Sequence, residues 1–244
     1  MLSEVEILSG ILSIIYVAIS TYVGLRIASK YFELKQRVFL LVGLTWIGLA
    51  SPWWPSMVSF LIAVSTGGDG LYNTPKIYFL IGNLLIPIFV LLWITAITDL
   101  LYKNKQKVIL TIFTIYCISF EVIFLYLLST DSTRIGELKG PVDVDYTYII
   151  LGFLLSIILI ILITGILFGR ESLKSDNPEV RLKGKLIIIA IILFSIGALL
   201  DSAIPLMLIT LPITRIILIL SAILFYGGFI LPNWMKKLFL KEGS

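Results

Sequence analysis

The chain alternates between long apolar runs and short polar connections. Charge-poor runs occupy residues 7–28, 38–64, 76–99, 108–129, 146–169, 185–207 and 213–235. Each reaches or exceeds the ~20 residues that a helix needs to cross the hydrocarbon core of a bilayer. The pattern therefore predicts one domain over residues 1–244, an all-α polytopic membrane protein built as a bundle of seven transmembrane helices.

Prolines mark local irregularities within this pattern. Pro52 and Pro55 stand in the stretch SPWWPS of the second run, and Pro87 stands in the third. Proline removes a backbone donor and favours a kink, which a membrane helix tolerates where it lines protein or a cavity. Pro212 suits the first turn of the seventh helix, after a tight apolar connection.

Composition supports the membrane assignment. Hydrophobic residues make up 59% of the chain and charged residues 14%, whereas a soluble domain carries about 25% charged residues. The formal charge of +4 could suggest nucleic acid as a partner. In a chain of this class, however, the position of each basic residue matters more than the total, so the partner expected first is the lipid bilayer and nucleic acid is not expected.

The basic residues are divided unequally between the two sides of the predicted bundle. Fifteen of the nineteen Lys and Arg residues fall in the connections after the first, third and fifth helices and in the C-terminal tail. Basic connections remain on the cytoplasmic side. We therefore expect a multi-pass protein of the cell membrane, with its N-terminus outside and its C-terminus inside.

The chain lacks several residue types on which catalysis and metal binding usually depend. It contains no histidine, and its single cysteine, Cys117, lies within an apolar run. No nucleophile–base pair, metal-ligand cluster or phosphate loop is evident in the sequence. We therefore predict no catalytic residues, no metal site and no cofactor, and an enzyme is disfavoured.

A few polar and aromatic residues lie inside the predicted spans, at similar depth. At 1.5 Å per residue, Asp201 lies about 24 Å from Lys185, and Glu121 about 21 Å from Lys107. Both distances place the carboxylates in the outer half of the bilayer. Intramembrane ionisable groups usually face a partner, a cavity or the bundle interior. The predicted ligand-binding residues at this depth are Glu121, Asp201, Arg215, Asn83, Trp53 and Trp54.

Two interpretations remain open for most of these residues. Asp201 either pairs with Arg215 across the hairpin of helices six and seven or lines a ligand or proton site. Glu121 has no basic residue at its depth in its own helix, so it is either a proton-handling or ligand-binding group or a neutral structural acid. Trp53 and Trp54 also suit the outer aromatic belt of a membrane protein.

Two stretches of the sequence echo each other. WIGLASPWWPSM in helix two and FSIGALLDSAIPLM in helix six both carry Ile-Gly, then a proline, then a methionine two residues later. A parallel duplication of three helices around a linker helix (3+1+3) would produce this echo, and such repeats occur in transporters.

One longer segment resembles a known family. Residues 169–201, GRESLKSDNPEVRLKGKLIIIAIILFSIGALLD, combine an inner loop carrying Pro-Glu and spaced basic residues with a helix ending Gly-x-x-x-Asp, and YGGFILPNWMKK follows near the end. This is similar to prokaryotic seven-helix sensory membrane proteins, both kinase-linked modules and free-standing relatives. The resemblance implies a seven-helix fold and a receptor-like role.

Two functions are therefore carried forward. The first is a receptor or sensor that takes a small-molecule ligand into an outward-facing polar pocket and acts through a separate cytoplasmic effector at the basic inner loops. The second is a transporter of small solutes or a proton-coupled transporter. The proline-broken helices, the internal echo and Glu121 are consistent with this function.

Overall fold

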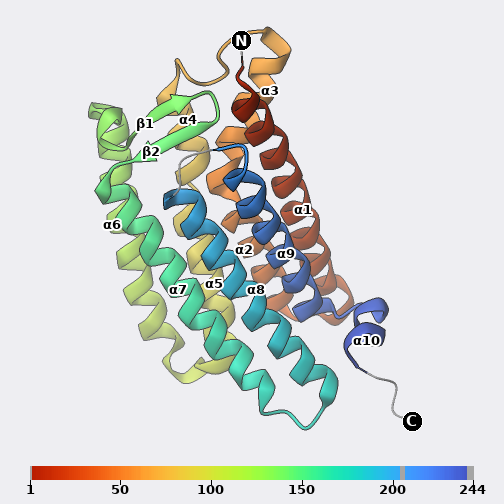
Figure 1. The fold of residues 1–244 in the computed structure, drawn as a ribbon. Coiled ribbons are helices and arrows are strands. Elements are labelled where there is room, and N and C mark those ends of the chain that lie inside the picture. The colour runs from red at the N-terminus through yellow and green to blue at the C-terminus, as the bar shows by residue number, and fades with distance from the viewer. Residues whose placement is uncertain (1, 204–206, 241–244) are drawn as a thin grey trace.

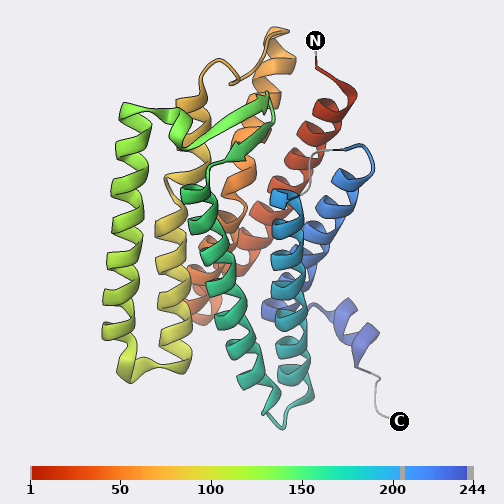
Figure 2. The same ribbon diagram turned by 60° about the vertical axis from the view of Figure 1, so that its left-hand side comes forward.

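The chain folds into a bundle of long helices that lie side by side. The computed structural model describes residues 2–203 and 207–240. The seven candidate spans are Glu4–Leu34, Arg37–Thr66, Pro75–Leu101, Lys103–Thr130, Tyr148–Leu173, Pro178–Ser202 and Thr210–Ile230. All seven are long and apolar enough to cross a membrane, which confirms the predicted number of spans, and they follow one common direction (Figures 1 and 2).

Several spans consist of more than one helical element. The elements are α1 (Glu4–Leu34), α2 (Arg37–Leu49), the 3-10 turn η1 (Ser51–Trp53), α3 (Trp54–Thr66), α4 (Pro75–Asn83), α5 (Ile86–Leu101), η2 (Lys103–Lys105), α6 (Gln106–Thr130), η3 (Ser132–Arg134), β1 (Gly136–Gly140), β2 (Asp143–Tyr146), α7 (Tyr148–Leu173), α8 (Pro178–Ala203), α9 (Thr210–Ile230) and α10 (Asn233–Phe239).

The expected proline breaks are present in the second and third spans. Pro52 lies in η1, between α2 and α3, and Pro55 lies in the first turn of α3. Pro87 lies in the first turn of α5, just after the interruption between α4 and α5. A proline in a first turn leaves no donor unsatisfied, because the first amide groups of a helix have no intrahelical acceptor. Each broken span is therefore two short helices in series.

The bounds of the spans differ from those expected, and the last three show why. The fifth helix begins at Tyr148, because Tyr146 belongs to a strand. The sixth begins at Pro178, so its first turns carry the basic residues that the sequence placed in a loop. The seventh ends at Ile230, because Leu231 adopts a left-handed conformation (φ 50°) and Pro232 follows it. Part of the sixth connection, residues 204–206, lies outside the described residues.

A β-hairpin covers one end of the bundle, within the polar connection between the fourth and fifth apolar runs. Strands β1 and β2 pair antiparallel, with Leu138 opposite Val144. The turn uses Gly140 at a φ of 148°, a conformation that favours glycine. In β1 the side chains alternate between buried and exposed, as in a strand with one face against a core. The fold is thus all-helical apart from this two-stranded sheet.

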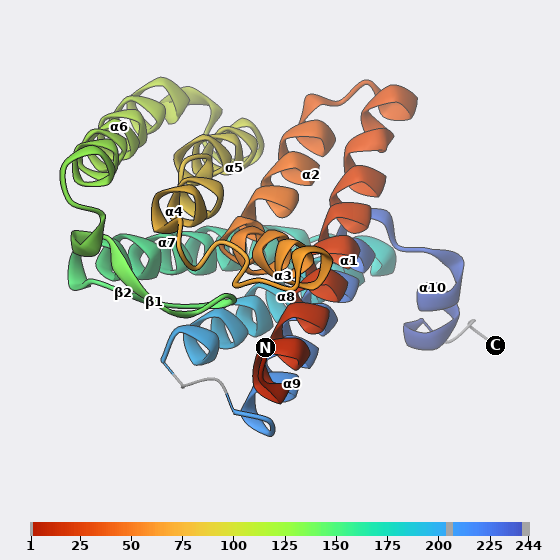
Figure 3. The same cartoon turned by 90° about the horizontal axis from the view of Figure 1, so that it is seen from above.

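Two ends of the bundle are named for what lies there. The hairpin end holds β1, β2 and the start of α1, and the tail end holds α10 and the connection from Lys174 to Asn177 (Figure 1). Seen from above the hairpin end, α6 lies at the edge of the bundle beside α5, while α1, α8 and α9 cluster on the opposite side (Figure 3).

The outer faces of the spans are apolar. Exposed hydrophobic side chains follow α6 in particular, including Val108, Ile112, Ile115, Val122 and Tyr126. Large contiguous apolar surfaces of this kind are rare on water-soluble monomers. They are the surfaces that a multi-pass membrane protein turns toward lipid.

The short helix α10 folds back against the tail end. Met235 is buried with Leu182, Leu186 and Leu231. The next residue, Lys236, forms an ion pair with Glu179 of α8, with 2.8 Å between Nζ and Oε1. This helix therefore packs against the N-terminal turns of α8 and does not extend the last span.

Glycines allow the closest helix–helix approach, between α1 and α2. A Cβ built on Gly43 would lie 2.4 Å from the carbonyl oxygen of Gly24 and 2.6 Å from the amide nitrogen of Ala28. These neighbours are backbone atoms and cannot rotate away. Small residues at membrane helix interfaces permit such contacts and the dispersion energy that comes with them.

We expect the substitution Gly43→Leu to destabilise the bundle by about 1–3 kcal/mol, the usual cost of overpacking. Gly152→Leu is the matched control, since a Cβ there meets nothing within 4 Å and the residue faces outward. Thermal unfolding of the purified protein measures both. Equal melting temperatures for the two variants would contradict the close packing of α1 on α2.

Candidate functional site

A cavity of about 440 Å³ lies beneath the hairpin. Strand β2 forms one wall, and the others come from the η1 break, α4, α7, α8 and α9. Its polar lining residues are Trp53, Ser56, Tyr78, Asp143, Asp145, Tyr146, Tyr148, Asp201, Ser202 and Arg215. A cavity of this size with a few convergent polar groups is typical of a small-molecule site.

A buried ion pair lies at the centre of this lining. Arg215 Nη1 is 2.7 Å from Asp201 Oδ1, and the two side chains are 3% and 16% exposed. Trp53 Nε1 donates a hydrogen bond of 2.8 Å to Asp201 Oδ2. The ion pair that the sequence suggested across the α8–α9 hairpin is therefore present. Trp53 of η1 is a third partner in the contact.

The guanidinium of Arg215 also contacts the aromatic face of Trp53. Its Cζ lies 5.6 Å from the centre of that ring, within the range of a cation–π interaction. Tyr16 of α1 packs edge-on against the same tryptophan, with 4.9 Å between ring centres. Arg215 Nε is buried and finds no hydrogen-bond acceptor in the part of the chain that the structure describes. This donor is therefore buried beside the cavity rather than exposed in its lining.

Hydrogen bonds from α3 and α4 hold the hairpin over the cavity. Ser56 of α3 donates to the carbonyl oxygen of Val142 at 2.9 Å, and it accepts from the hydroxyl of Tyr78 at 2.8 Å. Asn83 of α4 donates to the hydroxyl of Tyr146 at 3.2 Å. These bonds hold β2, and with it Asp143, at the rim of the cavity.

Asp143 is a carboxylate that the sequence analysis did not single out. It is half-buried, and its only hydrogen-bonding partner within the described residues is the amide of Val144, at 2.8 Å. Burial raises the pKa of the Asp143 carboxyl, the nearby Asp145 and Asp201 add to that rise, and Arg215 opposes it. The period-two alternation of GELKGPVDVDY would have indicated a strand placing this residue beside the bundle.

The six residues proposed from the sequence do not form one cluster. Trp53, Asp201 and Arg215 line the cavity together. Asn83 is buried behind its wall and reaches it only through Tyr146, while Trp54 packs against Phe89 of α5, with 6.2 Å between ring centres. These two residues stand beside the cavity without lining it.

Glu121 is separate from the cavity. It lies on α6 and is absent from the cavity lining. Its Oε2 atom is buried and has no hydrogen-bond partner among residues 2–203 and 207–240. The six residues were grouped by their predicted depth along the bilayer, and depth says nothing about position around the bundle axis. Glu121 lies apart because α6 is at the edge of the bundle (Figure 3). A functional role for Glu121 stays a prediction.

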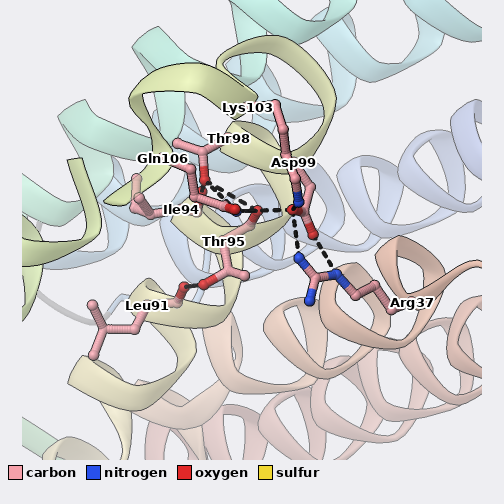
Figure 4. A network of polar contacts seen from close by, with 8 residues as sticks. All are labelled: Arg37, Leu91, Ile94, Thr95, Thr98, Asp99, Lys103 and Gln106. Atoms are coloured by element: carbon pink, nitrogen blue, oxygen red, sulfur yellow. Dashed lines mark hydrogen bonds and ion pairs between the residues drawn. The ribbon is translucent and has the colours of Figure 1, made fainter. Parts of the chain in front are cut away.

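A second polar cluster lies toward the tail end, around Asp99 (Figure 4). The guanidinium of Arg37 makes two hydrogen bonds of 2.6 Å to Asp99, and Lys103 and Gln106 donate to the same carboxylate at 2.5 and 2.9 Å. The Asp99 side chain is 7% exposed. The bidentate geometry is the strong form of such a contact, so the cluster joins α2, α5 and the start of α6.

Comparison with protein-family models, with curated proteins and with solved structures finds no match to this chain. The family resemblance of residues 169–201 therefore stays a prediction, and function has to be argued from the geometry alone.

We expect Asp201 and Arg215 to show strong coupling in a double-mutant cycle. Removing one partner of a buried pair leaves an uncompensated charge, at a cost of about 3–5 kcal/mol. Arg215→Met alone should therefore cost more stability than Asp201→Asn with Arg215→Met, because asparagine still accepts from Trp53 without a charge. Thermal unfolding of the four proteins measures the coupling energy. Additive single effects would show that the pair contributes no interaction.

Proposed function

We propose that this chain is a receptor or sensor of the cell membrane that binds a small ligand in the cavity beneath the hairpin. The observation that carries the proposal is the cavity itself, lined by a buried ion pair and a half-buried carboxylate. Buried charges in a membrane protein are expensive unless they serve a partner or a site. Here one of the carboxylates, Asp143, has no cationic partner in an ion pair within the described chain.

The proposed orientation places this cavity on the extracytoplasmic side. The basic connections and the basic tail gather at the tail end, including the sequence around Lys35, Lys103 and Arg170. The positive-inside rule assigns that end to the cytoplasm. The N-terminus and the hairpin then face outward, and a ligand reaches the cavity from outside the cell.

The region beneath the cavity favours a receptor over a conduit. Phe194 lines the cavity and packs against Trp46, which stacks on Phe225 with 3.8 Å between ring centres. Trp46 and Phe225 are both buried. A solute crossing the protein would have to displace this aromatic layer.

The same layer offers a route by which an occupied cavity influences the tail end. A ligand touching Phe194 and Trp53 contacts both α8 and the η1 break at once. Packed aromatic contacts resist continuous deformation, so a shift at the cavity is passed on as a rearrangement of the helices. The exposed basic residues at the tail end are where a separate cytoplasmic effector would bind.

A transporter is the second candidate. The specific observation in its favour is that two spans are broken beside the cavity, at η1 and between α4 and α5. Substrate sites in transporters are often formed by such discontinuous helices. The proposed 3+1+3 repeat belongs to this alternative and stays a prediction, since Pro205 of the echo lies outside the described residues.

Cysteine labelling separates the two candidates. The native Cys117 is buried, so the wild-type chain is a low-reactivity background. Ser202→Cys places a thiol in the cavity lining, and Asp176→Cys places one in the exposed connection at the tail end. A membrane-impermeant maleimide should label Ser202→Cys but not Asp176→Cys in intact cells, with the reverse result in inverted membrane vesicles.

Each alternative result has a definite meaning. Labelling of Ser202→Cys from both sides would indicate alternating access and favour the transporter. Labelling of Asp176→Cys in intact cells would reverse the orientation and overturn the outward-facing site.

A further inference from the structure

We infer that the ligand of this cavity is an amphiphilic cation, with an ammonium head held at the hairpin rim and an apolar tail lying along α7. The inference rests on the proposed function, since it assumes that the cavity binds a ligand. It adds the chemical class of that ligand. The class is inferred from the charges at the rim, from the aromatic residues of the lining and from the change to apolar residues deeper in the cavity.

The charges at the rim are unbalanced. Three carboxylates, from Asp143, Asp145 and Asp201, line the cavity, and Arg215 is the only basic residue among the described lining residues. Arg215 is already paired with Asp201 at 2.7 Å. Asp145 is 72% exposed and lies 3.7 Å from the ammonium of Lys139. The remaining carboxylate, Asp143, is half-buried, so a cation entering the rim meets an uncompensated negative charge.

An anionic ligand fits this rim poorly in spite of Arg215. The guanidinium is opposed by Asp201 and lies over the Trp53 ring, so little of its charge is available. An anion would also lie close to Asp143, and like charges in a site of low polarity repel strongly. The Nε donor of Arg215 is buried, so it is not available to an anion in the cavity.

Aromatic residues line the same part of the cavity. Trp53, Tyr78, Tyr146 and Tyr148 come from four different elements and all contribute to the lining. Aromatic faces attract ammonium groups, quaternary ones included, because the ring quadrupole is negative above its plane. A carboxylate and several aromatic side chains together are the usual means by which proteins recognise a substituted ammonium.

The lining becomes apolar with depth. From the rim, α7 contributes Leu151, Leu154 and Ile158 to the wall, and α8 contributes Ala198 and Phe194. Phe194 precedes Asp201 by about two helical turns, which places it about 10 Å below the charged pair. The cavity thus combines an acidic, aromatic rim with an apolar inner part. A cation attached to a medium-length hydrocarbon chain matches both parts.

The probe for this inference is octyltrimethylammonium, compared with octanol and octanoate, which share the chain length and differ in charge. The protein is reconstituted in phosphatidylglycerol nanodiscs, and binding is followed by tryptophan fluorescence and titration calorimetry. We expect the cation to bind at least tenfold more tightly than either of the other two probes. We expect Asp143→Asn, which keeps the acceptor for the Val144 amide, to abolish that preference.

Glu137→Gln is the matched control, because it removes one negative charge from the exposed face of the same hairpin, outside the cavity. It should keep the preference for the cation. Tighter binding of octanoate, equal binding of all three probes, or equal losses in Asp143→Asn and Glu137→Gln would overturn the inference. So would the absence of saturable cation binding, whereas the proposed site is judged separately by labelling of Ser202→Cys.

The head group could come from solution or from a membrane lipid, and lipid composition distinguishes the two sources. The anionic surface of phosphatidylglycerol concentrates cations in every variant, so the comparison uses the affinity difference between the wild type and Asp143→Asn. If the ammonium of a phosphatidylcholine head occupies the rim, this difference should shrink in phosphatidylcholine nanodiscs. An equal difference in both discs would identify a ligand from solution. Either result retains an ammonium as the recognised group.

The affinity for the cation should fall at low pH. The groups facing Asp143 are Asp145 on its own strand, Asp201 of α8, Arg215 of α9 and Tyr78 of α4. Burial raises the pKa of Asp143 above that of an exposed aspartate, and only the ionised form attracts the cation. Binding should therefore weaken as pH falls through this raised pKa, and Asp143→Asn should remove that dependence. An unchanged profile in Asp143→Asn would assign the titration to another group.

Discussion

The buried contact between Asp201 and Arg215 organises the hairpin end of this protein. Two opposite charges inside an apolar bundle stabilise it only when each has a partner and further hydrogen bonds satisfy their remaining atoms. Here the pair joins α8 to α9, and the indole of Trp53 brings in the break between α2 and α3. One carboxylate thus fixes the relative positions of three spans and defines the wall of the cavity beside it.

The remaining walls follow from local interruptions of regular structure. The η1 break turns Trp53 toward the ion pair, and the hairpin holds Asp143 at the rim through the hydrogen bond from Ser56 to Val142. Neither device belongs to an uninterrupted helical bundle. The cavity lies where the helices are broken and a short sheet covers their ends. Further toward the tail end, buried aromatic side chains pack between the helices, and the Asp99 cluster joins α2 to α5 and α6.

The seven spans could be predicted because apolar length is a property of sequence alone, and the ion pair because intramembrane charges have few alternatives to pairing. The arrangement of the helices around the bundle axis could not be predicted in the same way. Glu121 was grouped with the others by its predicted depth, but it lies on a helix at the edge of the bundle, and depth carries no information about that direction. Asp143 was missed because it was counted as part of a polar loop, although its neighbours alternate as a strand requires.

The attachment of α10 has a mechanical consequence. Met235 is buried beside Leu182 and Leu186, and Lys236 is tied to Glu179, so the last short helix is anchored on the first turns of α8. The other end of α8 carries Asp201. A helix that tilts about its packed middle moves its two ends in opposite directions. A tilt of α8 that displaces Asp201 would therefore also displace the contacts that hold α10.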